Sequence, residues 1–149
     1  MSQKLPPDKD TFEHMVESLN AISGEPRSST LISHLYLEYL LDWILRKKLP
    51  KPEKIIKRTF SSKLELVESM AILPDILMKH LWMINDIRNL YAHRIDTNSE
   101  EFDKEFRIKV EKTEWYQDMN KPEKIPTPSA YTLVMVRVYH NLYGEFERM

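Results

Sequence analysis

Three side chains in one short segment have the types and spacing needed for chemistry on a phosphate: Arg88, Asn89 and His93. The planar guanidinium of arginine fits the oxygens of a phosphate or of a carboxylate. Histidine titrates near neutral pH, so it can act as a general acid or base. Asn89 and His93 are four residues apart, so on a helix they share a face, and a hydrogen bond between them would orient the imidazole. These three residues are the candidate catalytic site.

The apolar pattern of the same segment indicates where Arg88 faces. Leu77, Leu81 and Ile84 form an apolar stripe at helical spacing, and position 88 continues it. We therefore expect Arg88 to face the buried side of its helix or a cleft, where a charge is costly unless it is paired. The partner is a phosphate or, in a purely structural role, a carboxylate from the acidic region 98–118. His93 has a structural alternative as well, because a cation interacts favourably with the last carbonyls of a helix.

The spacing of Arg88 and His93 limits how they can act together. Five residues correspond to a separation of about 140° around a regular helix, so one helix does not direct both side chains at one atom. Either the helix ends or loosens near Tyr91, or two copies of the chain pool their residues across a two-fold axis. We favour the two-fold arrangement, because the segment 30–48 is apolar nearly all round and such a helix is central or covered by a second subunit.

Two further groups of polar residues are weaker candidates. His34, Glu38 and Asp42 form a thin polar stripe at four-residue spacing, which is typical of the solvent side of a helix. The stripe is also compatible with metal binding, but no matching ligand cluster accompanies it, so we expect no metal and no cofactor. Glu38 as an indirect partner of Arg88 is a hypothesis.

The stretch 46–58 is strongly basic and is a candidate for contact with a nucleic-acid backbone. This stretch contains no aromatic residue, and the first one after it is Phe60, so a base-stacking surface is not evident. A solvated charged linker is an equally good interpretation. The candidate contact residues are Lys47, Lys48, Lys51, Lys54, Lys57 and Arg58.

The composition excludes several classes of protein. The 149 residues have a formal net charge of -1, no cysteine and only two glycines. Disulfide frameworks, thiolate zinc sites and cysteine nucleophiles are excluded, and so are Gly-rich phosphate loops. The sequence has no apolar run long enough to span a membrane, and the first ten residues lack the apolar core of a signal peptide. We expect a cytoplasmic protein without membrane contact.

Apolar segments separated by prolines predict an all-α fold. We expect a flexible leader over 1–9 and a single helical domain over 10–149, built as a bundle of about five to six helices. Region 98–118 has both helical and alternating spacing, and 119–129 is expected to be a loop. The first expected helix runs from Asp10 or Thr11 to about Ile22, and the second, capped by Ser28 or Ser29, runs from about Thr30 to Lys48. The third begins at Ser61 or Ser62, with a Ser62–Glu65 capping box, and ends near Met70. The fourth runs from Pro74 to about His93, and the last begins at Thr127 or Ser129.

The segment Arg88-Asn89-Leu90-Tyr91-Ala92-His93 resembles the motif of the HEPN superfamily (higher eukaryotes and prokaryotes nucleotide-binding domains), in which an arginine, a polar residue and variable residues precede a histidine. The setting is similar too, because the motif stands near the end of a long helix that follows an apolar one. The resemblance covers about residues 10–95 and is closest to the mannitol operon repressor-like branch and related uncharacterised groups.

The resemblance implies a helical bundle, commonly dimeric, in which the motifs face a shared cleft. Active members are metal-independent endoribonucleases that leave a cyclic phosphate. In that case His93 would be the general acid or base, Arg88 would hold the scissile phosphate and Asn89 would orient His93. The implied partners are RNA, a second copy of the chain, and an antitoxin or regulatory protein that silences the cleft. Other branches bind nucleotides or partners without catalysis, so a non-catalytic regulatory module is the alternative.

Overall fold

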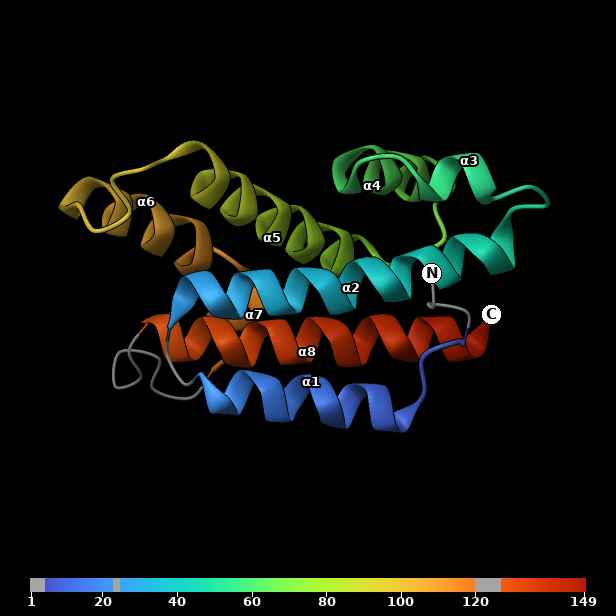
Figure 1. Ribbon diagram of the computed structural model, residues 1–149, viewed down its shortest axis with the longest axis horizontal. Helices are drawn as coiled ribbons and strands as arrows, with labels where there is room; N and C mark the ends of the chain where they lie inside the picture. Colours follow the sequence, from blue (N-terminus) through green and yellow to red (C-terminus); the bar gives the residue numbers. More distant parts are fainter. Residues whose placement is uncertain (1–4, 23–24, 120–126) are drawn as a thin grey trace.

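The computed structural model describes residues 5–22, 25–119 and 127–149, which form helices joined by turns (Figure 1). No strand occurs in these residues, which confirms the predicted all-α single domain, and none of their helices is long and apolar enough to cross a membrane. The helices are α1 (Lys9–Ala21), α2 (Pro26–Lys48), α3 (Glu53–Ile56), α4 (Phe60–Ser69), α5 (Asp75–His93), α6 (Glu100–Glu111), α7 (Glu114–Gln117) and α8 (Thr127–Arg148).

Helix α2 lies at the centre of the bundle. It runs beside α8 through the middle of the molecule and also packs against α1, α4 and α5 (Figure 1). Its fully buried leucines and isoleucine point into these contacts. Packing on several sides within one chain therefore explains most of the apolar character of α2. The exceptions are Leu31 and Leu35 near its N-terminal end, which are exposed.

The helix starts differ from the prediction because other residues cap them. Asp8 caps α1 by accepting a hydrogen bond from the Thr11 N–H at 3.1 Å. The carboxylate of Glu25 caps α2 by accepting from the N–H groups of Arg27 and Ser28 at 3.2 and 2.9 Å, so the predicted cap at Ser28 or Ser29 is wrong. Pro26 then occupies the first turn, where its missing N–H costs nothing.

Helix α4 is also capped one turn earlier than predicted. Thr59 accepts the hydrogen bond from the Ser62 N–H at 3.2 Å, so Ser62 lies inside the helix and the predicted Ser62–Glu65 capping box is wrong. The short helices α3 and α7 were not predicted at all. A four-residue helix contains too few residues for a periodic apolar pattern to appear.

The ambiguous region 98–118 is helical. Ser99 caps α6, and Phe102, Phe106 and Val110 form its buried face at helical spacing. Ile108 is exposed, so the alternating pattern that included it does not correspond to a strand. Most of the predicted loop 119–129 lies outside the described residues, and α8 begins at Thr127 as one of the predicted alternatives has it.

Candidate active site

Arg88 lies on the surface of α5, next to the first turns of α2. It is exposed, and it lines a small hollow of about 110 Å³ together with Arg27, Thr30, Leu31, Tyr91 and Ala92. Of the two positions expected for Arg88, the buried side of the helix is wrong, and the residue instead borders a hollow. The apolar stripe turns at this point, because Ile87 rather than position 88 continues it into the core.

His93 and Arg88 point in different directions from the same helix. Helix α5 stays helical to His93, so it does not end near Tyr91, and its regular geometry places the two residues about 140° apart. His93 is exposed and Asn89 half-buried, and no hydrogen bond joins them in the described part of the chain. One protomer therefore does not bring the three motif residues into a single pocket.

The acidic region pairs with Arg94 instead of Arg88. The guanidinium of Arg94 donates to Asp96 at 2.8 Å and to Glu105 of α6 at 2.9 Å, and this ties the turn after α5 to α6. Among the described residues Arg88 has neither an ion pair nor a side-chain hydrogen bond. The guanidinium of Arg88 thus lies on the surface without a carboxylate partner in the part of the chain that the structure describes.

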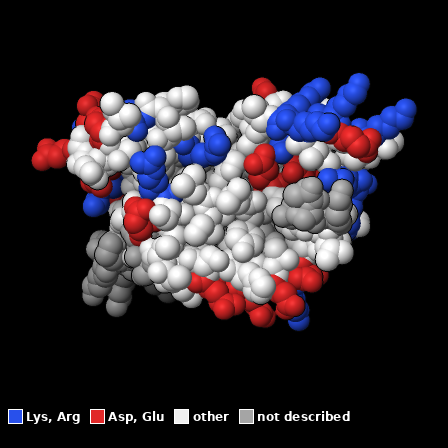
Figure 2. All heavy atoms as spheres, in the orientation of Figure 1, with Lys and Arg blue, Asp and Glu red and all other residues white. Residues whose placement is uncertain are grey.

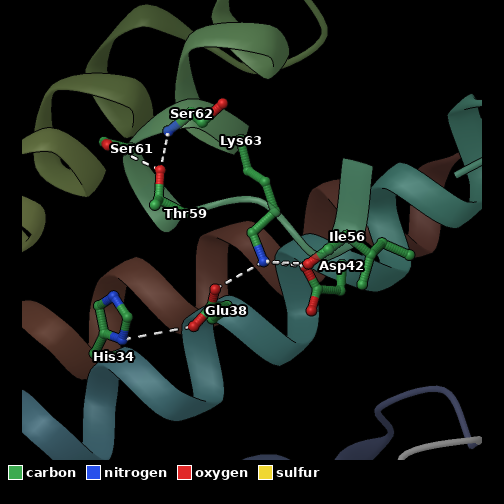
Figure 3. A network of polar contacts seen from close by, with 8 residues as sticks. All are labelled: His34, Glu38, Asp42, Ile56, Thr59, Ser61, Ser62 and Lys63. Atoms are coloured by element: carbon green, nitrogen blue, oxygen red, sulfur yellow. Dashed lines mark hydrogen bonds and ion pairs between the residues drawn. The ribbon is translucent and has the colours of Figure 1, made fainter. Parts of the chain in front are cut away.

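The polar stripe of α2 is covered by α4. Lys63 of α4 is only 1% exposed, and its ammonium lies 2.7 Å from Glu38 and 2.7 Å from Asp42 (Figure 3). It also donates to the carbonyl of Ile56 at 3.2 Å. The prediction that His34, Glu38 and Asp42 form the wet side of α2 is therefore wrong. Two carboxylates spaced by one helical turn require a cation when another helix covers them.

His34 is the buried end of this network. It is 5% exposed, its ring packs edge-on against Phe60, and its Nδ1 lies 3.9 Å from Glu38 (Figure 3). Burial lowers the pKa of His34 to about 4; the negative charge of Glu38 opposes this shift, and the positive charges of Arg88 and Lys63 add to it. Glu38 itself forms no ion pair with Arg88 in the described residues. The hypothesised connection between Glu38 and Arg88 is therefore not a direct contact, and His34, which lies beside Glu38, is the residue that could mediate it.

Acid is expected to destabilise the protein through His34. Its pKa is about 4 in the folded chain against an ordinary value of 6.5, so the unfolded chain binds the proton first as the pH falls. The free energy of unfolding therefore decreases between about pH 6.5 and pH 4, by at most about 1.4 kcal/mol per pH unit for one group. Urea unfolding at pH 7 and pH 5 measures this dependence. His34→Gln should flatten it, and the exposed His140→Gln is the control. Equal slopes for wild type and His34→Gln would contradict the expectation.

The basic residues occupy the opposite end of α2 from the motif. Lys47 donates to the carbonyl of Phe146 at 2.8 Å and lies 3.8 Å above its ring, so it holds the end of α8. The remaining candidates are exposed around α3, where Figure 2 shows a group of Lys and Arg side chains; they are Lys48, Lys51, Lys54, Lys57 and Arg58. Leu31 and Lys47 are sixteen positions apart along α2, which corresponds to about 24 Å along the helix axis.

Comparison of the chain with protein-family models, curated sequences and solved structures finds no match. Within the described residues, no three histidine, aspartate or glutamate side chains gather in a way that could hold a metal ion. The chemistry of the surface around Arg88 and His93 is therefore the basis for assigning a function.

Proposed function

We propose that the chain is an HEPN-like, metal-independent endoribonuclease that works as a homodimer. The observation that carries the proposal is the surface guanidinium of Arg88, which has no carboxylate partner among residues 5–22, 25–119 and 127–149 and lies five residues before the exposed His93 on one helix. An arginine on a rigid helix at the edge of a hollow is suited to hold a phosphate oxygen. An exposed histidine can exchange protons with a substrate near neutral pH.

A second copy of the chain supplies the missing half of each site. Leu31 lines the same hollow as Arg88 and is 51% exposed, and Leu35, one turn further along α2, is 66% exposed. Exposed leucines beside the surface guanidinium of Arg88 fit a two-fold interface that buries them and directs Arg88 of one protomer towards His93 of the other.

The proposed reaction is the transfer of an RNA phosphoryl group to the neighbouring hydroxyl. The 2′-oxygen attacks phosphorus, the bond to the 5′-oxygen breaks, and a cyclic phosphate and a free 5′-hydroxyl result. His93 either accepts the proton of the 2′-hydroxyl while water protonates the leaving 5′-oxygen, or protonates the leaving oxygen while water accepts the proton of the 2′-hydroxyl. Arg88 neutralises the charge that develops on the phosphate oxygens.

Incubation of the purified protein with mixed RNA in the presence of a chelator tests this proposal. The expected products end in a cyclic phosphate, which mass spectrometry identifies. If a varied set of RNAs stays intact under these conditions, the proposed activity is wrong.

The dimer itself makes a separate prediction. The wild type should be dimeric at micromolar concentration, and Leu35→Lys should weaken the dimer about tenfold or more, because it places a charge in an apolar contact. Leu133→Lys, which changes an exposed leucine of α8, is the matched control and should leave the dimer intact. Light scattering over a concentration series measures both. A monomeric wild type would contradict the shared site.

Binding of nucleic acid without cleavage is the second candidate function, and the exposed basic residues around α3 favour it. The protein would then act as a regulatory module similar to the mannitol operon repressor-like proteins. Its complex with nucleic acid should weaken steeply with salt, because each phosphate contact releases counterions. A gel shift that is salt-sensitive and unaffected by His93→Ala, without any cleavage, supports this function over the first.

A further inference from the structure

A larger hollow lies next to the one that Arg88 borders. It has a volume of about 630 Å³ and is formed by the start of α2, the end of α5, the turn that follows and α6. Tyr91, Phe102 and Phe106 contribute to its lining. The ring centre of Tyr91 lies 5.0 Å from that of Phe102 and 6.5 Å from that of Phe106. A volume of this size lies in the range of sites that bind small molecules.

Tyr91 connects this hollow to the catalytic motif. Tyr91 and Arg27 line both the larger hollow and the smaller one beside Arg88. Tyr91 is only 6% exposed, and its hydroxyl is buried and has no hydrogen-bond partner in the described structure. Burial raises the pKa of this hydroxyl above its ordinary value, so it keeps its proton. A buried hydroxyl without a partner is unfavourable.

The carboxylate residues lie only at the larger hollow, whereas Arg88 lies only at the smaller one. Arg27 lines both hollows, and Glu25, Glu100 and Asp103 line the larger one. A nucleotide has the complementary polarity, with an anionic phosphate at one end and hydrogen-bond donors on some bases at the other. The pair of hollows therefore matches a nucleotide whose phosphate lies at the arginines.

The carboxylates favour one base. Guanine presents two adjacent donors, N1–H and the N2 amino group, and a carboxylate accepts both with its two oxygens. Uracil offers a single N–H between two carbonyl oxygens, which a carboxylate repels. Glu25 already caps α2, and Asp103 pairs with Arg107 at 2.8 Å. Glu100 is exposed and, among the described ion pairs, holds no cation, so it is the carboxylate we assign to the base.

We propose that the larger hollow binds the guanine base of a nucleotide, with Glu100 accepting from the base, while Arg27 and Arg88 hold its phosphate. This inference deepens the proposed function, because it makes guanosine the preferred residue next to the scissile phosphate. A free guanosine monophosphate and a guanosine within RNA present the same groups, so the two sources are separated by experiment.

Direct binding is the first arm of the test. Isothermal titration of the full-length protein with the four nucleoside monophosphates should show GMP binding at least about tenfold tighter than UMP, a ratio that corresponds to about 1.4 kcal/mol. Glu100→Gln should remove this preference, because the amide replaces one acceptor with a donor. Glu101→Gln changes the neighbouring exposed carboxylate, which does not line the hollow, and should bind like the wild type.

Mapping of RNA cleavage sites is the second arm. Cleavage next to guanosine that becomes indiscriminate in Glu100→Gln places the base of an RNA residue in the hollow. Selective GMP binding together with indiscriminate cleavage identifies the free nucleotide as the ligand. Selective GMP binding without any cleavage preserves the inference and overturns the nuclease. Equal affinity for GMP and UMP overturns the inference, whether or not the protein cleaves RNA.

Discussion

Replacement of Lys63 by alanine is expected to lower the free energy of unfolding by about 3 kcal/mol. Lys63 is almost fully buried and is the cation between Glu38 and Asp42. Removing one member of a buried ion cluster leaves the others without compensation, which costs about 3–5 kcal/mol in proteins. Both carboxylates keep some contact with water, so we expect the lower end of this range. Lys63→Ala also removes the contact with the carbonyl of Ile56.

Lys79→Ala is the matched control for this prediction. Lys79 lies 3.5 Å from Glu114, but both side chains are exposed, and such surface pairs contribute about 0–1 kcal/mol. Urea unfolding at neutral pH measures both variants. A triple variant with Lys63→Met, Glu38→Gln and Asp42→Asn should be more stable than the single variant Lys63→Met, because no charge then remains buried. A Lys63→Ala variant as stable as Lys79→Ala would show that the network contributes little.

Replacement of His93 by alanine is expected to lower kcat/KM for RNA cleavage by a factor of about 10²–10⁴, the usual contribution of a general acid or base. The variant should fold normally, because His93 is exposed and has no hydrogen bond in the described structure. His140→Ala removes another exposed histidine, on α8, and should leave the rate unchanged. Full activity of His93→Ala would remove this residue from the mechanism.

A mixture of two inactive variants distinguishes a shared site from a site within one chain. If Arg88 of one protomer works with His93 of the other, a dimer of Arg88→Ala with His93→Ala contains one intact site. After subunit exchange, an equimolar mixture should therefore recover about a quarter of the wild-type activity, because half of the dimers are mixed and each has one of two sites. No recovery, with each variant inactive alone, would contradict the two-fold arrangement.

The long helices could be predicted from the sequence because their apolar residues recur over several turns. The buried face of α8 and the end of α5 at His93 follow directly from this periodicity. The starts of α2 and α4 could not be predicted, since several neighbouring residues can cap a helix and the choice depends on the path of the chain. The four-residue helices α3 and α7 depend on their tertiary surroundings.

The candidate site was predictable in its residue types but not in its surroundings. The register of the apolar stripe switches to Ile87, so spacing alone placed Arg88 on the wrong side of the helix. Lys63 carried a signal that could have been recognised, because it stands three residues after Phe60 and four before Val67, on one face of α4. A lysine on an apolar face next to a stripe of carboxylates indicates pairing across helices. Nothing in the sequence around Tyr91 indicates that its hydroxyl lacks a hydrogen-bond partner in the described structure.

The position of Lys63 also determines the register of α4 along α2. Apolar side chains such as Leu64 and Val67 tolerate a shift of one turn, because leucines and valines can interchange contacts at little cost. Glu38 and Asp42 do not, since the ammonium reaches both only where it lies between two successive turns. The apolar contacts therefore supply most of the attraction between the two helices, whereas the Lys63 ammonium contacts both carboxylates in the observed alignment.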